Sequence, residues 1–278
     1  MGRQVRIGVV APSGRVDPAV PAEVQALAAR LYPAGEVEIV FDPQCFLSHG
    51  HFAGDDAARV EGFLRIANDP GYDAVWFGRG GYGACRPAEA ILAGLTDAAR
   101  SKTYLGYSDA GFLLAGLYAR GIGRAVHGPV PHEIRRAGGA AAVTRALAFL
   151  VDSDPATLEP ACKPGVKTAA FNITVLSQLL GTALEPDLTD HVLMLEEVAE
   201  YMYRIDRSLF HITSNPGVRR IAGLRLGRCS DIPPNDPDFG LGEEEVARHW
   251  CGRAGIPYLG RADIGHDADN KVVPFGPM

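Results

Sequence analysis

The chain has 278 residues, of which 47% are hydrophobic and 22% are charged, and its formal net charge is −6. This composition is that of a globular enzyme with a large core, and the acidic balance argues against a nucleic-acid or membrane partner. The five cysteines are scattered and form no C-x-x-C pair, so we expect reduced thiols in a cytoplasmic protein without a metal or a cofactor.

The first half of the chain alternates strand-like and helix-like segments. Apolar runs rich in β-forming residues predict strands, and Asp17 and Asp55 are the expected N-caps of two helices. The strands are expected at 5–10, 37–41, 73–77 and 102–107, and the helices at 18–31, 55–68 and 110–120. This order predicts an α/β fold whose N-terminal domain, residues 1–150, has a doubly wound, mostly parallel sheet.

Residues 151–165 show no clear periodicity and contain three prolines, so we interpret them as a linker. Beyond it we expect a smaller C-terminal α/β domain, residues 166–278. Its helices are predicted at 170–180, 203–213 and 242–253, and its strands at 191–195 and 223–226. Gly181 is the expected C-cap of the first of these helices.

Ser108 stands where the strand-like run 102–107 meets the helix-like stretch 110–120. A serine on such a turn lies near a helix N-terminus, where backbone N–H groups point outward, as in the nucleophile elbow of hydrolases. The G-x-S-x-G pattern of that elbow is incomplete, because Ala110 replaces its last glycine. A serine that only caps the helix would give the same pattern, so other residues of the chain are needed to distinguish a nucleophile from an N-cap.

A glycine-rich loop, Gly78-Arg-Gly-Gly-Tyr-Gly83, follows the strand at 73–77. Its four glycines leave backbone N–H groups unhindered, as an anion or oxyanion site requires. It matches neither the Walker loop nor the dinucleotide fingerprint. Ligands of parallel sheets bind beyond the carboxyl ends of the strands, so we expect this loop to face Ser108, although a tight turn is the alternative.

A serine nucleophile needs a base and an acid that orients the base. Among eight histidines, His266 lies in a Gly/Asp/Asn-rich loop between two strand-like pieces, and His49 and His51 lie in another polar loop. Glu196 is singled out as the acid because it directly ends an apolar strand, with Glu197 and Glu200 as rivals. A structural histidine and a solvated glutamate remain the alternatives.

Four motifs in order resemble the LD-carboxypeptidases, a family of serine peptidases. They are Arg79–Gly83, Gly106–Asp109, Leu195–Glu200 with Tyr203–Arg207, and Gly265-His266 with Asn270 and Pro274. The resemblance implies a catalytic triad of Ser108, Glu196 and His266, with the Gly81 and Asp109 amides as the oxyanion hole. It also implies a homodimer and the release of the terminal D-alanine from murein tetrapeptide in cell-wall recycling.

The chain departs from the family pattern at Ala169-Ala-Phe-Asn-Ile173, where members often read Gly-Gly-Asn-Leu, so side-chain specificity could differ. An exopeptidase must also bind a free terminal carboxylate, for which Arg79 and Arg204 are candidates, with structural ion pairs as the alternative. Two other functions stay open. One is a related hydrolase that cleaves a peptidyl-nucleotide or another amide, and the other is a non-catalytic binder of a sugar or nucleotide.

Overall fold

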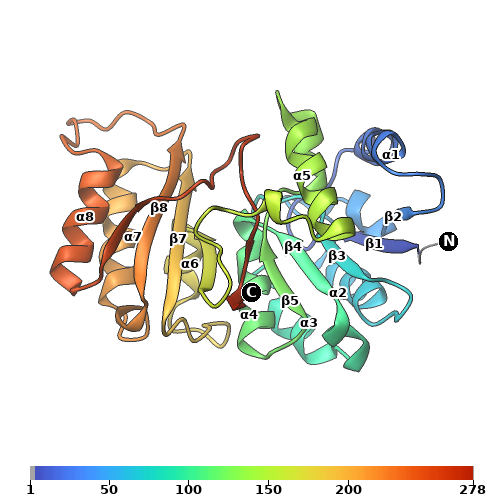
Figure 1. Cartoon of the computed structure of the whole chain (residues 1–278), viewed down its shortest axis with the longest axis horizontal. Helices are drawn as coiled ribbons and strands as arrows, with labels where there is room; N and C mark the ends of the chain where they lie inside the picture. Colours follow the sequence, from blue (N-terminus) through green and yellow to red (C-terminus); the bar gives the residue numbers. More distant parts are fainter. Residues whose placement is uncertain (1–3, 278) are drawn as a thin grey trace.

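The computed structural model describes residues 4–277, which form two mostly parallel sheets side by side (Figure 1). The first sheet has the strand order β10-β5-β4-β3-β1-β2. Its five parallel strands are β1 (Val5–Val10), β2 (Val37–Phe41), β3 (Ala74–Phe77), β4 (Thr103–Gly106) and β5 (Arg124–His127). The expected parallel sheet of the N-terminal half is thereby confirmed.

Helices cover both faces of this sheet because neighbouring strand residues point to opposite sides. Val9 and Trp76 belong to one buried cluster with α1 (Val20–Leu31) and α5 (Gly139–Asp152). Val10 and Phe77 belong to another, with α2 (Asp56–Ala67), α3 (Ala88–Gly94) and α4 (Gly111–Ala119). The first sheet is therefore doubly wound, as the sequence predicts.

The second sheet has the order β11-β6-β7-β8-β9. Its strands are β6 (Lys167–Asn172), β7 (His191–Val198), β8 (Gly223–Ser230), β9 (Tyr258–Arg261) and the short β11 (Gly276–Pro277). One face packs against α6 (Ile173–Leu179), α7 (Met202–Ser214) and α8 (Glu243–Ala254). The opposite face is covered by coil, which includes Cys162 and Ile264.

The chain's last segment joins the two sheets. After Ile264 the chain returns to the first sheet, where β10 (Val273–Pro274) pairs antiparallel with β5. Two residues later β11 pairs antiparallel with β6 of the second sheet. Helix α4 also packs on α6, so closely that a Cβ at Gly111 would lie 3.0 Å from Val175 Cγ1. One apolar core thus runs through both halves and fixes their relative position.

The structure corrects the expected helix at 170–180. Residues 167–172 form strand β6, and the helix begins only at Ile173 with Asn172 as its N-cap. A fully buried strand is apolar on both faces, and a short apolar run alone does not tell strand from helix. Strand β7 also extends beyond the predicted 191–195 to Val198, so Glu196 lies within the strand. Within the expected linker, residues 151–152 still belong to α5, and the domain boundaries stay predictions.

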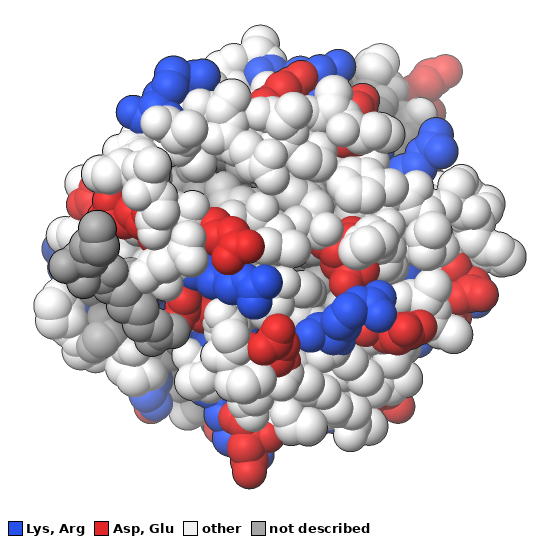
Figure 2. Space-filling model, turned by 90° about the vertical axis from the view of Figure 1, so that its right-hand side faces the viewer, with Lys and Arg blue, Asp and Glu red and all other residues white. Residues whose placement is uncertain are grey.

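Charged side chains are mixed on the face shown in Figure 2, where blue and red groups alternate on a largely uncharged surface. That face, as far as the described residues form it, carries no extended block of one sign. No helix within residues 4–277 is both long and apolar enough to cross a bilayer.

Candidate active site

Ser108 occupies a strained turn at the carboxyl end of β4. Its backbone φ is +59°, a left-handed conformation that is uncommon for residues other than glycine. A single turn of 3₁₀-helix, Ser108–Ala110, then leads into α4. Gly106 permits the close approach to β3, because a Cβ there would lie 2.8 Å from Phe77 Cβ. This is the geometry of a nucleophile elbow, with the first amides of a helical turn beside the serine.

The glycine-rich loop lies directly against this turn. A Cβ at Gly80 would lie 3.1 Å from Ser108 Cβ and 3.2 Å from its Oγ, so the backbone approaches the serine as closely as glycine allows. Gly81 has φ +105°, which disfavours any side chain. The Asp109 carboxylate ties loop and turn together, since it accepts hydrogen bonds from Ala84 N at 2.7 Å and from Ser13 Oγ at 2.5 Å.

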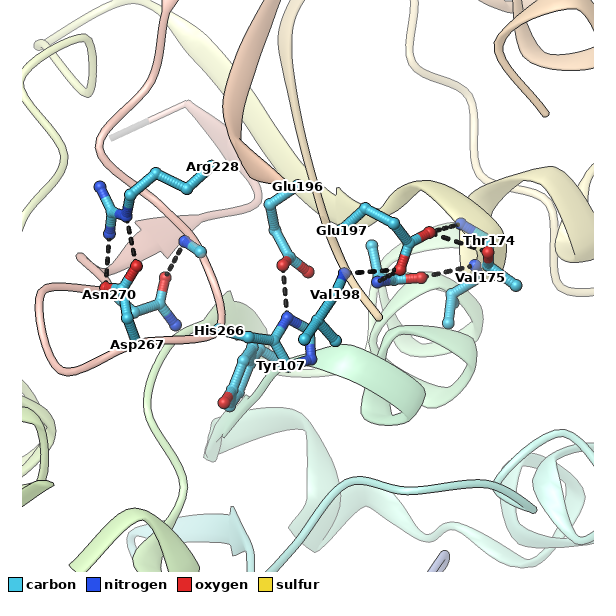
Figure 3. A network of polar contacts seen from close by, with 12 residues as sticks. Tyr107, Thr174, Val175, Glu196, Glu197, Val198, Arg228, His266, Asp267 and Asn270 are labelled. Atoms are coloured by element: carbon cyan, nitrogen blue, oxygen red, sulfur yellow. Dashed lines mark hydrogen bonds and ion pairs between the residues drawn. The ribbon is translucent and has the colours of Figure 1, made fainter. Parts of the chain in front are cut away.

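His266 reaches the same place from the second sheet and is paired with Glu196. Its Nδ1 donates to Glu196 Oε2 at 2.5 Å, and its ring lies 4.8 Å from the Tyr107 ring (Figure 3). Burial disfavours the imidazolium, but the completely buried Glu196 carboxylate outweighs it and raises the pKa of His266. Because Nδ1 is engaged, Nε2 is the nitrogen left to accept a proton.

The loop that carries His266 is fixed from several sides. Arg228 of β8 forms an ion pair with Asp267 (Figure 3). Asn270 Oδ1 accepts hydrogen bonds from Gly265 N at 3.2 Å and from His127 Nε2 at 3.1 Å. His127 is buried at the end of β5, and this burial lowers its pKa, so it stays neutral. The His266 loop is therefore bound to both sheets.

Glu197 points away from His266, as alternation along a strand requires. Its carboxylate accepts hydrogen bonds from Asn172 Nδ2 at 2.6 Å, from Thr174 N at 2.9 Å and Oγ1 at 2.8 Å, and from Val198 N at 2.9 Å (Figure 3). Glu197 thus holds the start of α6 against the end of β7. The other rival, Glu200, pairs with Arg204 at 3.7 Å instead.

One open pocket of about 210 Å³ collects these groups. It is lined by Arg79, Gly80, Gly81, Tyr107, Ser108, Val130, His132, Glu133, Arg136 and His266. Within residues 4–277 no hydrogen bond joins Ser108 Oγ to His266, although both line this pocket.

The pocket contains some of the expected residues and not others. Ser108, His266, Gly81 and Arg79 line it, while Glu196 and Asp109 support it from behind. Arg204 lies outside it, beside Glu200 and Tyr203. The remaining histidines except His132 also lie elsewhere, in the set His49, His51, His127, His191, His211 and His249.

The sequence reasoning missed four side chains of the pocket, Val130, His132, Glu133 and Arg136. They follow the carboxyl end of β5, the next parallel strand beyond β4. Ligands of such sheets bind at that edge, so the position of this segment after a buried strand was the available signal.

Comparison with known proteins places this geometry in a family. The LD-carboxypeptidase N-terminal domain matches residues 7–128, and the LD-carboxypeptidase C-terminal domain matches residues 167–278. A Synechocystis protein provisionally named a carboxypeptidase is 30% identical over 98% of this chain and 89% of its own length. The murein tetrapeptide carboxypeptidase of Pseudomonas aeruginosa is 26% identical over 98% of this chain and 91% of its own.

Solved structures show the same fold. The muramoyltetrapeptide carboxypeptidase from Oxalobacter formigenes superposes with a TM-score of 0.79 at 24% identity, over 97% of this chain and 93% of that one. The microcin C7 self immunity protein MccF superposes with a TM-score of 0.78 at 16% identity, over 99% and 92%. These two structural likenesses extend over both sheets.

Proposed function

Because the chain belongs to the LD-carboxypeptidase family, we propose that it is a serine peptidase that removes the terminal D-alanine from murein tetrapeptide. The family and its carboxypeptidase-named relatives support hydrolase activity. The observation that carries the proposal is the 2.5 Å pair of His266 Nδ1 and Glu196 Oε2, whose imidazole shares a pocket with Ser108.

The first half of the reaction forms an acyl-enzyme. Ser108 Oγ attacks the carbonyl carbon of the scissile amide while His266 Nε2 takes the hydroxyl proton. The Gly81 and Asp109 amides donate to the resulting oxyanion, and each such donor is worth about 2.7–4 kcal/mol. The intermediate then expels D-alanine, whose amine receives the proton from Nε2.

The second half restores the enzyme. A water molecule gives a proton to His266 Nε2 and attacks the acyl carbon, and the proton passes to Ser108 Oγ as the tripeptide leaves. Glu196 keeps the imidazole in the tautomer with hydrogen on Nδ1 and stabilises its positive charge in both halves. Burial of Glu196 strengthens this interaction because little solvent screens it.

The alternative substrate, a peptidyl-nucleotide, calls for an aromatic platform beside the serine. Trp76 is completely buried and donates to Pro129 O at 2.8 Å, and Trp250 donates to Asp206 at 2.9 Å, away from the pocket. Tyr82 follows Gly81 and is 54% exposed, so it is an aromatic side chain that is available for such a platform.

The deciding experiment measures D-alanine release from murein tetrapeptide in parallel with cleavage of a peptidyl-adenylate. We expect D-alanine release, and we expect Ser108→Ala to keep the fold and lower kcat by ~10⁴–10⁶, because triad residues act as a unit. Cleavage of the adenylate alone would favour the alternative. Binding of either compound without turnover, or substantial activity of Ser108→Ala, would contradict serine catalysis.

We also propose that the protein works in the cytoplasm as a homodimer. Its five cysteines are all free, which agrees with a reducing compartment. The dimer rests on the family resemblance, and light scattering of the purified protein tests it, with a monomeric mass as the contrary result.

A further inference from the structure

The pocket carries more charge than the triad needs. Arg79, Glu133 and Arg136 line it together with Ser108 and His266. The two guanidinium groups of Arg79 and Arg136 are matched in the pocket by the single carboxylate of Glu133. The Glu196 carboxylate is already hydrogen-bonded to the His266 imidazole. The pocket therefore has a surplus positive charge, which suits a substrate that brings one carboxylate.

The direction of proton transfer decides where that carboxylate lies. His266 must protonate the nitrogen of the departing residue, so this nitrogen lies on the His266 side of Ser108. Standard bond lengths place the terminal carboxyl carbon only about 2.5 Å from that nitrogen. A group that binds the terminal carboxylate must therefore lie beside His266, opposite the oxyanion donors.

Arg136 lies there. Its Nη1 donates to the backbone oxygen of His266, which anchors the guanidinium on the base loop. Among the hydrogen bonds of residues 4–277, Nη2 has no acceptor, and the side chain is 40% exposed. We infer that Arg136 binds the terminal carboxylate of the departing residue and so makes the enzyme an exopeptidase. This inference rests on the proposed peptidase function.

Glu133 and Tyr107 orient this guanidinium. Glu133 Oε2 lies 3.3 Å from Arg136 Nε, and the glutamate side chain is only 9% exposed. Its other oxygen accepts a hydrogen bond from Tyr107 Oη at 2.5 Å. Burial raises the pKa of Tyr107, so its hydroxyl stays protonated and donates. Arg136 is thereby held in place before substrate arrives, which lowers the entropic cost of binding.

The two arginines expected from the sequence suit this role less well. Arg79 belongs to the glycine-rich loop on the oxyanion side, and its Nη1 donates to the backbone oxygen of Arg15 at 3.0 Å. Arg204 lies outside the pocket and is engaged by Tyr203 and Glu200. Neither has a contact with the His266 loop among the hydrogen bonds of the described residues.

The test compares a tetrapeptide acid with its C-terminal amide. The Kd for each is measured by calorimetry in the Ser108→Ala background, which needs no turnover, and kcat/KM is measured in the active enzyme. We expect Arg136→Ala and Arg136→Gln to weaken binding of the acid by about 10- to 100-fold, the value of a charge-assisted contact, and to leave binding of the amide unchanged. Arg136→Gln retains a hydrogen-bond donor for the carbonyl oxygen of His266. It therefore distinguishes the loss of the positive charge from the loss of support for the His266 loop.

Arg135→Ala is the matched control. Arg135 is the preceding residue, is 45% exposed, and pairs with Glu23 of α1 instead of lining the pocket. It should leave the ratio of acid to amide binding as in the parent enzyme. An unchanged ratio of acid to amide binding in both Arg136 variants would overturn the inference, whether neither affinity changes or both fall equally. Failure of the parent protein to bind or cleave the tetrapeptide acid would instead contradict the proposed function.

Discussion

Replacement of Glu196 by glutamine changes one atom of the buried pair, and the structure indicates which way the amide will turn. Glu196 is completely buried, and its Oε1 has no hydrogen-bond partner within residues 4–277, whereas Oε2 accepts from His266 Nδ1. A glutamine NH₂ placed at Oε1 would be a buried donor without an acceptor, at a cost of about 1–3 kcal/mol. Turned toward Nδ1, it finds an acceptor.

The favoured orientation forces the wrong tautomer. If the glutamine donates to His266 Nδ1, the ring proton moves to Nε2, and Nε2 can no longer take the proton of Ser108. The negative charge that stabilises the imidazolium is lost as well. We expect kcat to fall by ~10⁴, as for the equivalent change in a serine triad, which corresponds to about 5.4 kcal/mol at 1.36 kcal/mol per factor of ten.

The assay is steady-state release of D-alanine, with thermal unfolding as a check on the fold. Glu197→Gln is the matched control, because it makes the same change on the other face of β7. Glu197 accepts four hydrogen bonds from donors, which one amide oxygen cannot all satisfy, so we expect Tm to fall by roughly 2–12 °C. Its kcat at 25 °C should stay within the same order of magnitude. Near-normal turnover by Glu196→Gln, or the larger kinetic loss in Glu197→Gln, would refute this reasoning.

Two further predictions concern the base and the oxyanion loop. Burial works against the charged form of His266, but Glu196 raises its pKa above the ordinary value of 6.5, and the base must be neutral to act. The acid limb of the kcat/KM profile should therefore have its midpoint above 6.5, with activity lost as the pH falls through it, and a midpoint at or below 6.5 would contradict this. Asp109→Ala leaves Ala84 N and Ser13 Oγ without their buried acceptor, so we expect a lower Tm and a kcat lower by ~10²–10³, the effect of a lost oxyanion donor. Unchanged kcat in a folded Asp109→Ala variant would show that the loop keeps its position without the carboxylate.

The sequence predicted elements well where local signals were unambiguous. Strands β1 and β2 agree with the predicted ranges, because short apolar runs there end at proline or polar residues. Asp55 caps α2 as expected, with its side chain accepting from Ala58 N. The predicted Ser108 and His266 line one pocket, and Glu196 is hydrogen-bonded to His266 behind it, although the three come from distant segments.

Other features depend on tertiary contacts that no local pattern encodes. The predicted helix at 170–180 includes residues 170–172 of strand β6, because a strand buried on both faces lacks alternation. Arg136 reaches the site through its contact with the backbone of His266, which is 130 residues away in the chain. An arginine followed by Ala137 and two glycines gives no sign of that contact in the sequence.

Strand β10 completes the first sheet, but it is synthesised long after its neighbour β5. Strand β5 ends at His127, and its antiparallel neighbour begins at Val273, 146 positions later in the sequence. At about 5–20 residues per second, the edge of β5 stays unpaired for roughly 7–30 s during synthesis. An open strand edge invites pairing with other chains. The edge of β5 is therefore open to such contacts until β10 has been synthesised.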